Sequence, residues 1–191
     1  MKDRSLKPET DLVQRLQRND EEALGLLMGM YYSDLYNYAA SFTKDEGLIK
    51  DCIQEIFISL WQRRETAGTI LCPRYYFLRA VKNKILKALH KSLRNASLTD
   101  PQNEYEFYHE FSIEQITIEK QVTEEKAARL RHTLSLLSKK QKEIIYLKYY
   151  LYLDHGQIAE LMNLNRQSVY NLLHETIHKL RNLLQIEFVN Q

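Results

Sequence analysis

Two carboxylates and an amide recur at helical spacing near residue 51. Asp51, Gln54, Glu55 and Ile58 follow one another at i, i+3, i+4 and i+7, which places them on one face of a helix. A general acid–base pair needs carboxylates that face each other across a cleft and have divergent pKa values. Adjacent turns of one exposed helix provide neither. We therefore expect a docking surface here rather than a catalytic pair, with an ordinary solvated face as the alternative.

Metal and cofactor chemistry find little support in the residue types. The chain has six histidines and two cysteines, Cys52 and Cys72. Only His174 and His178 have the spacing of a helical metal pair, and an incidental origin is favoured for them. The five scattered glycines cannot form a phosphate-binding loop. We expect no catalytic residue, no metal, no cofactor and no enzymatic activity.

A basic segment runs from Cys72 to Arg94 and contains no acidic residue. It contains seven bases and, near its start, the aromatic triplet Tyr75, Tyr76 and Phe77. Such unopposed charge is relieved when a polyanion binds, because phosphate contacts release condensed counterions. This segment is expected to be an amphipathic helix that contacts nucleic acid. Its outer edge is formed by Arg79, Asn83, Lys87, His90 and Arg94.

The C-terminal third has helix-turn-helix spacing. A short helix follows Asp154, which with Gln157 has the residue types of a capping box. A three-residue turn leads to a longer helix capped by Asn165. Recognition side chains must lie on the outer N-terminal half of that second helix, since this end enters the major groove. The candidates are Arg166, Gln167, Ser168, Tyr170, Asn171 and His174.

The rest of the chain must position these residues, and its composition favours helices. Five glycines and three prolines in 191 residues are few for a protein with many turns. The clearest helix, from about Glu46 to Arg63, buries a stripe formed by Ile49, Cys52, Ile53, Ile56, Phe57, Leu60 and Trp61. Other helices are predicted to start at Thr10 or Asp11, Asn19 or Asp20, Pro73, Ser138, Asp154 and Asn165.

The charge distribution divides the chain into three blocks. Residues 1–98 carry a net charge of +4, residues 99–125 a net charge of −7, and residues 126–191 a net charge of +5. We therefore predict an all-α protein of two small helical domains, residues 1–95 and 126–191, joined by an acidic linker, residues 96–125.

Membrane and secretion signals are not expected. The first residues are polar with no apolar core behind them, and no apolar run approaches the roughly 18–20 residues that cross a bilayer. These features predict a cytoplasmic protein without membrane insertion.

Several motifs, taken in order, resemble those of sigma-70 factors. The run Asp51 to Phe57, followed by Leu60 and Trp61, is similar to the signature D-x-x-Q-[DE]-x-F…L-W of sigma region 2. Tyr76 to Asn83 is similar to the segment that follows it in that family. Residues 157–162 and 169–181 resemble region 4. The two matching domains alone resemble the extracytoplasmic-function (ECF) group.

This resemblance implies a role for each surface. Asp51, Gln54, Glu55 and Ile58 would bind core RNA polymerase, chiefly the clamp helices of its β′ subunit, with further contacts to β. The loop from Arg63 to Ile70 would capture a flipped base of the −10 element. The implied −10 contacts are Arg63, Arg64, Arg74, Arg79, Lys82, Asn83 and Lys87. The outer face described above, from Arg166 to His174, would read the −35 element. Promoter DNA and an anti-sigma factor are the other implied partners.

The sequence also leaves open a different class of regulator as an alternative hypothesis. A one-component helix-turn-helix regulator would bind operator DNA as a symmetric dimer without polymerase. A helical enzyme would need converging ligands or acids, which the sequence does not offer. Copurification with polymerase subunits separates the first alternative from a sigma factor.

Overall fold

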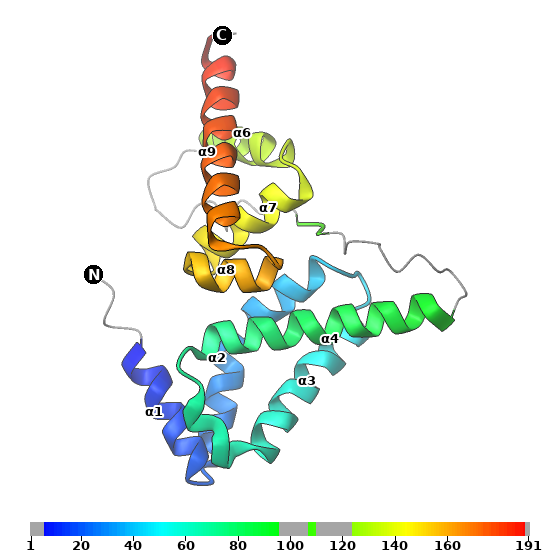
Figure 1. The fold of residues 1–191 in the computed structure, drawn as a ribbon, viewed down its shortest axis with the longest axis vertical. Coiled ribbons are helices and arrows are strands. Elements are labelled where there is room, and N and C mark those ends of the chain that lie inside the picture. The colour runs from blue at the N-terminus through cyan, green and yellow to red at the C-terminus, as the bar shows by residue number, and fades with distance from the viewer. Residues whose placement is uncertain (1–5, 96–106, 110–123, 190–191) are drawn as a thin grey trace. The chain divides into compact units, whose positions relative to one another are not determined.

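The structure is a computed structural model that describes residues 6–95, 107–109 and 124–189. The chain divides into two compact units, Met1–Tyr105 and Glu106–Gln191, which are described separately. All regular secondary structure in the described residues is helical (Figure 1), which confirms the all-α prediction. Most of the predicted linker, residues 96–106 and 110–123, lies outside the described residues.

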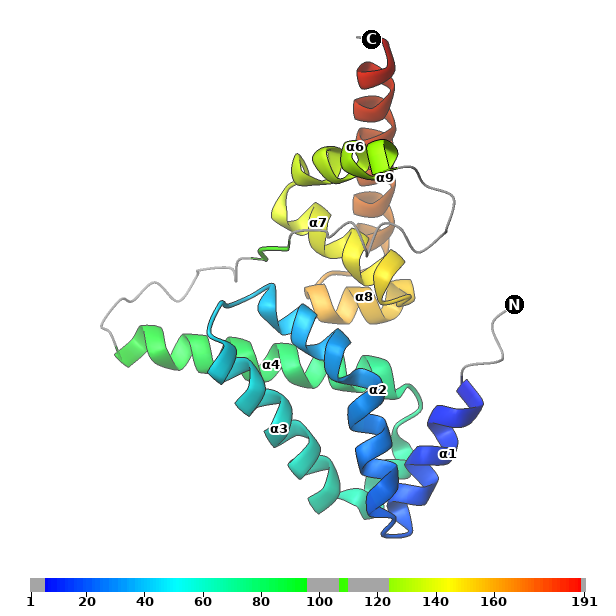
Figure 2. The same cartoon turned by 180° about the vertical axis from the view of Figure 1, so that it is seen from behind.

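The first unit contains four α-helices and a short 3₁₀ helix among its described residues. They are α1 (Leu6–Gln17), α2 (Glu21–Ala40), α3 (Glu46–Gln62), η1 (Arg64–Thr69) and α4 (Pro73–Asn95). In both views α4 lies across α2 and α3, and it packs against each of them (Figures 1 and 2). The first helix begins at Leu6 rather than at Thr10 or Asp11, so the predicted start was too late by about one turn.

Local capping explains the other helix starts in this unit. The Asp20 side chain accepts a hydrogen bond from the Ala23 amide (3.3 Å), and Asp45 accepts one from the Leu48 amide (3.0 Å). Pro73 occupies the first position of α4, where its missing N–H has no helical partner to lose. These contacts confirm Asp20 and Pro73 as helix starts.

Phe77 joins three helices in the core of the first unit. Its ring centroid lies 5.1 Å from that of Tyr31 on α2 and 5.0 Å from that of Phe57 on α3. All three side chains are at most 3% exposed. The predicted stripe of α3 is buried from Ile49 through Leu60, whereas Trp61 is half-buried. This core fixes which faces of α3 and α4 remain exposed.

The second unit places three shorter helices against one long one. Its elements are α6 (Glu124–Ser135), α7 (Lys139–Ile145), a π-helical turn η2 (Tyr146–Tyr150), α8 (His155–Met162) and α9 (Arg166–Val189). The helix α9 packs against α6, α7 and α8 (Figure 1). Capping boxes start α7 at Ser138 with Gln141 and α8 at Asp154 with Gln157. The helix starts at Ser138 and Asp154 and the box at Asp154 were predicted, whereas the part of Gln141 was not.

Candidate functional surfaces

The acidic face of α3 is defined by Asp51, Gln54, Glu55 and Ile58. All four are exposed, and Ile58 keeps 46% of its surface in solvent although it is apolar. They lie opposite the buried stripe of the same helix, so the core of the first unit fixes the direction in which they point. The structure thus brings the four predicted residues together on one exposed surface.

Glu55 on this face forms an ion pair with the next helix. The Lys84 Nζ atom of α4 lies 2.6 Å from the Glu55 carboxylate. Hydrogen bonding and the charge of Lys84 lower the pKa of the Glu55 carboxyl from its ordinary value. A partner that takes Glu55 must therefore compete with Lys84 for the same carboxylate. The sequence placed both residues in helices but gave no signal of this pair, which spans 29 positions.

The basic edge of α4 consists of Arg79, Asn83, Lys87 and His90, all of which are exposed. The opposite side of the helix is buried through Phe77, Leu78, Val81 and Ile85. This separation confirms the predicted amphipathic helix with a positively charged edge. Nothing is described of the Arg94 side chain, the last residue predicted for this edge.

Lys82 does not lie on that edge. It is only 3% exposed, and its ammonium lies 5.5 Å from the centroid of the Phe42 ring. Lys82 follows Leu78 by four positions and precedes Ile85 by three, so it shares the core-facing side of α4. This burial places Lys82 away from the predicted DNA-binding edge and argues against its predicted contact with DNA.

Two further residues predicted to bind DNA are engaged within the first unit. Arg74 pairs with Asp34 of α2 and lies over the Tyr31 ring, 5.7 Å from its centroid. Arg64 lies 4.6 Å from the centroid of the Trp61 ring and donates a hydrogen bond to the Trp61 carbonyl oxygen (3.0 Å). Both arginines hold local structure in place.

The segment predicted as a base-capture loop forms η1 and its flanks, residues 63–70. Thr66 Oγ1 donates to the Arg63 carbonyl oxygen, and Thr69 Oγ1 donates to that of Thr66, both at 2.9 Å. Ala67 is buried, whereas Arg63, Thr66 and Thr69 are exposed. The segment is therefore a folded turn with one buried anchor and exposed polar groups on either side of it.

The helix-turn-helix is built by α8 and α9. Asp154 accepts hydrogen bonds from the amides of Gly156 (2.8 Å) and Gln157 (2.9 Å). Asn163 ends α8 in the left-handed conformation, with φ of 54°, which asparagine tolerates better than most residues. Asn165 then accepts a hydrogen bond from the Ser168 amide (2.7 Å) and starts α9 as predicted.

The outer face of α9 carries the predicted recognition residues. Gln167 Nε2 donates to Asn171 Oδ1 (3.0 Å), and the rings of Tyr170 and His174 stack with centroids 6.5 Å apart. Ser168 is half-buried, with its backbone amide in the cap. The remaining five are exposed: Arg166, Gln167, Tyr170, Asn171 and His174.

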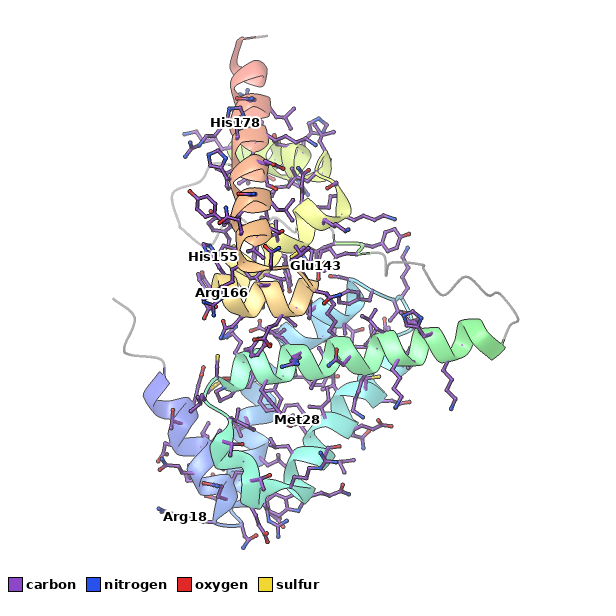
Figure 3. The ribbon with its side chains drawn as sticks, viewed as in Figure 1. Arg18, Met28, Glu143, His155, Arg166 and His178 are labelled. Atoms are coloured by element: carbon purple, nitrogen blue, oxygen red, sulfur yellow. The ribbon has the colours of Figure 1, made fainter. Side chains whose placement is uncertain are left out.

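His155 is an additional residue at this surface. Its ring lies edge-on to that of Tyr170, with centroids 6.5 Å apart. The Arg166 guanidinium lies close to the same helix start, 3.0 Å from where a Cβ on Gly156 would be. Figure 3 shows His155 and Arg166 near each other where α8 and α9 meet. The capping box that precedes His155 was the available signal, since it fixes His155 at the first position of α8.

A short part of the predicted linker packs onto the second unit. Phe107 is 2% and His109 8% exposed, and the His109 ring lies 4.1 Å from that of Tyr146. Between them, Tyr108 lies beneath the Lys139 ammonium, 4.6 Å from the ring centroid. Burial raises the pKa of Tyr150, which stacks on Tyr146, to about 12. Aromatic residues inside an otherwise acidic segment were the overlooked signal.

Neither metal clusters nor membrane spans occur in the part of the chain that the structure describes. There, no group of three or more histidine, cysteine, aspartate or glutamate side chains could hold a metal ion. Likewise, no helix in the described ranges is both long and apolar enough to cross a membrane.

Comparison with known families gives two matches that together span more than half of the chain. The family described as Sigma-70 region 2 matches residues 27–95, and that described as Sigma-70, region 4 matches residues 127–180. No curated protein sequence matches the chain.

Two solved structures share the fold at low sequence identity. One is CnrH in complex with the cytosolic domain of CnrY, at 20% identity and a TM-score of 0.53, covering 93% of this chain and 97% of that one. The other is the sigma factor RpoE in complex with the anti-sigma factor NepR from Bartonella quintana. It has 14% identity and a TM-score of 0.53, covering 88% of this chain and 98% of that one.

Proposed function

The chain belongs to the sigma-70 family, and from this premise we propose that it is a sigma factor of the ECF type and how its surfaces contribute to transcription initiation. Sigma factors are initiation factors that bind core RNA polymerase and promoter DNA. In this proposal a region 2 domain, residues 1–95, and a region 4 domain, residues 126–191, are joined by the acidic linker, residues 96–125. The polymerase performs the chemistry, and this chain is not an enzyme.

The acidic face of α3 is the proposed polymerase-binding surface. Two carboxylates, an amide and an exposed isoleucine combine charge with an apolar contact, which suits a basic, partly apolar groove on a partner. The β′ subunit is the proposed main partner, with β contacting the chain elsewhere. An acidic face on a domain of positive net charge is otherwise hard to account for, because it would weaken that domain's attraction to DNA.

The basic edge of α4 and the segment 63–70 are the proposed −10 surface. Arg63, Arg79, Asn83 and Lys87 are exposed, as side chains that contact phosphates and bases must be. Arg64 and Arg74 act in this proposal by holding the surface in shape, because their guanidinium groups are engaged with Trp61 and Asp34. Lys82 is left out because it is buried.

The outer face of α9 is the proposed −35 surface, and the helix-turn-helix that presents it is the observation that carries the proposal. Arg166 and Gln167 suit bidentate contacts to guanine and adenine edges in the major groove, and Asn171 suits adenine. His155 extends this surface toward the phosphate backbone from the start of α8.

We further propose a cytoplasmic location and control by an anti-sigma factor. RpoE, which shares the fold, was solved in complex with an anti-sigma factor. None of the findings favours the one-component regulator. Such a regulator would not require a sigma region 2 domain, and this chain matches that family over residues 27–95.

The test is reconstituted transcription with purified core polymerase on a library of promoter fragments. We expect Arg166→Ala to lower initiation at cognate promoters and to leave copurification with polymerase intact. The double variant Asp51→Ala with Gln54→Ala should reduce copurification instead. Initiation by core polymerase that is no higher with this chain than without it, across the library, would refute the proposal.

A further inference from the structure

The C-terminal end of α1 and the turn after it hold the segment 63–70. This helix precedes the region 2 match, which begins at residue 27, yet it packs against η1 (Figure 1). Gln17 Nε2 donates a hydrogen bond to the Glu65 carbonyl oxygen (3.1 Å), across 48 positions of sequence. Arg64 Nε donates to the Asn19 side-chain oxygen. Two side chains from outside the matched region thus contact consecutive residues of η1.

Gly68 makes the contact with Gln17 possible. A Cβ at this position would lie 2.5 Å from Gln17 Nε2 and 2.7 Å from its Oε1, closer than real Cβ atoms approach. The backbone of Gly68 does not have a positive φ, so the need for glycine here is one of space. The amide of Gln17 therefore lies directly against the backbone of η1.

The Asn19 contact acts on Arg64, the first residue of η1. Asn19 has a φ of 64°, a left-handed conformation that asparagine adopts more readily than most residues. Asn19 accepts a hydrogen bond from Arg64, and the Arg64 guanidinium also contacts the Trp61 ring and the Trp61 carbonyl oxygen. η1 is thus held at Arg64 and Glu65, and the Gln17 amide also lies against Gly68, while Ala67 is buried and Thr66 and Thr69 stay exposed.

We infer that Gln17 and Asn19 are positioning residues for the capture of an unstacked promoter base by the segment 63–70. The inference rests on the proposed function and adds α1 to the machinery of promoter opening. A base-capture site works only if its polar groups are held within a fraction of an ångström, and such precision comes from supporting contacts. Gln17, the last residue of α1, and Asn19, in the turn after it, supply these contacts.

Gln17→Glu is the decisive variant, and Gln14→Glu is its matched control. Gln17→Glu keeps the size of the side chain but removes the donor to Glu65. Gln14→Glu introduces the same charge on an exposed position of the same helix. Polymerase holoenzyme carrying each variant is mixed with promoter DNA that has 2-aminopurine within its −10 element, and fluorescence reports the unstacked base.

We expect Gln17→Glu to lower the open-complex signal about two- to tenfold, the range of one lost hydrogen bond, and Gln14→Glu to leave it unchanged. Copurification with core polymerase and binding to a −35 fragment by the holoenzyme should match those of the control. If Gln17→Glu behaves like Gln14→Glu, or lowers all these readouts together, the positioning role is wrong. A wild-type chain that opens no promoter would instead refute the proposed function itself.

A second pair of variants tests the geometry. Gly68→Ala should lower the open-complex signal because its Cβ collides with the Gln17 amide. Combined with Gln17→Ala, which removes that amide, Gly68→Ala should cause no further loss, so the two effects are non-additive. Additive losses would mean that Gly68 and Gln17 act independently and would overturn the inference.

Discussion

Lys82 and Lys84 are two positions apart on α4, and their surroundings differ. The Lys82 ammonium lies over the Phe42 ring and is buried, whereas that of Lys84 pairs with Glu55 at the protein surface. Helical periodicity accounts for the difference, since Lys82 is in phase with Leu78 and Ile85 and Lys84 is not. Positive charge along a sequence therefore overstates the charge that a nucleic acid can reach.

This difference predicts unequal effects on DNA binding. Lys87→Met should reduce the slope of log K against log salt for holoenzyme binding to promoter DNA by about one, because an exposed lysine releases counterions from the phosphate it contacts. Lys82→Met, which nearly preserves the buried volume, should leave that slope unchanged. Titrations over a series of salt concentrations give both slopes. Equal slopes for the two variants would show that exposure is no guide to phosphate contact here.

The Glu55–Lys84 pair predicts a pH effect with a defined sign. The pKa of the folded Glu55 carboxyl is lowered, so its contribution to stability is present above the unfolded pKa and is lost as pH falls through the folded pKa. Because Glu55 is largely exposed, the contribution is small. Lys84→Met should raise the Glu55 pKa toward its ordinary value, as measured by carboxyl NMR titration. Lys87→Met is the matched control and should leave the Glu55 pKa unchanged, since only Lys84 lowers it.

At the scale of elements, Phe77 is the residue on which the packing of α2, α3 and α4 depends. We expect Phe77→Ala to cost about 3–5 kcal/mol in the free energy of unfolding, because it removes a fully buried ring and leaves a cavity. Tyr76→Ala is the neighbouring control and should cost much less, since Tyr76 is 37% exposed. Urea denaturation followed by circular dichroism measures both values. Similar costs would contradict the central role of Phe77.

The capping box of α8 allows a second test at this scale. Asp154→Ala removes the acceptor for the Gly156 and Gln157 amides and should destabilise the helix by about 1 kcal/mol. Asp154→Asn keeps a capping oxygen and should cost only a fraction of that. Thermal unfolding of the full chain compares the two variants. An equally large loss for Asp154→Asn would mean that charge rather than capping explains the effect.

Element starts were predictable because they depend on neighbouring residues. Asp20, Ser138, Asp154 and Asn165 each accept hydrogen bonds from amides two or three residues later, and the sequence contains both partners. The buried stripe of α3 was predictable for the same reason. Periodicity also contained the signal for Lys82, which was outweighed by the resemblance to a basic helix.

Contacts between distant residues were not predictable in this way. The hydrogen bond from Gln17 to Glu65 and the packing of Phe107 and His109 near Tyr146 each join segments dozens of residues apart. No local propensity reports such contacts, because they arise only after the elements have packed. The outer face of α9 was predictable only in part. The cap at Asn165 fixed which residues of α9 face outward, whereas the contact of the His155 ring with Tyr170 depends on how α8 packs against α9.

At the scale of the whole molecule, recognition is divided between two units. Each presents a modest surface, and two linked modules bind tightly only when their spacing fits both sites at once. We therefore expect the free chain to bind promoter DNA weakly and the holoenzyme to bind it tightly, as compared by gel shift at one salt concentration. Tight, sequence-specific binding by the chain alone would contradict this division.

The placement of the two sulfhydryl groups has a practical consequence for measuring how the units move. Both belong to the first unit, where Cys52 lies under the α3 surface with its pKa raised by burial, and Cys72 is half-buried. Alkylating dyes react with the thiolate form. Because Cys52 is buried and its pKa is raised, it should react slowly until local unfolding exposes α3. With Cys72→Ser in place, a cysteine introduced on the outside of α9 would be the main labelling site, and slow modification of Cys52 would time the opening of the first unit.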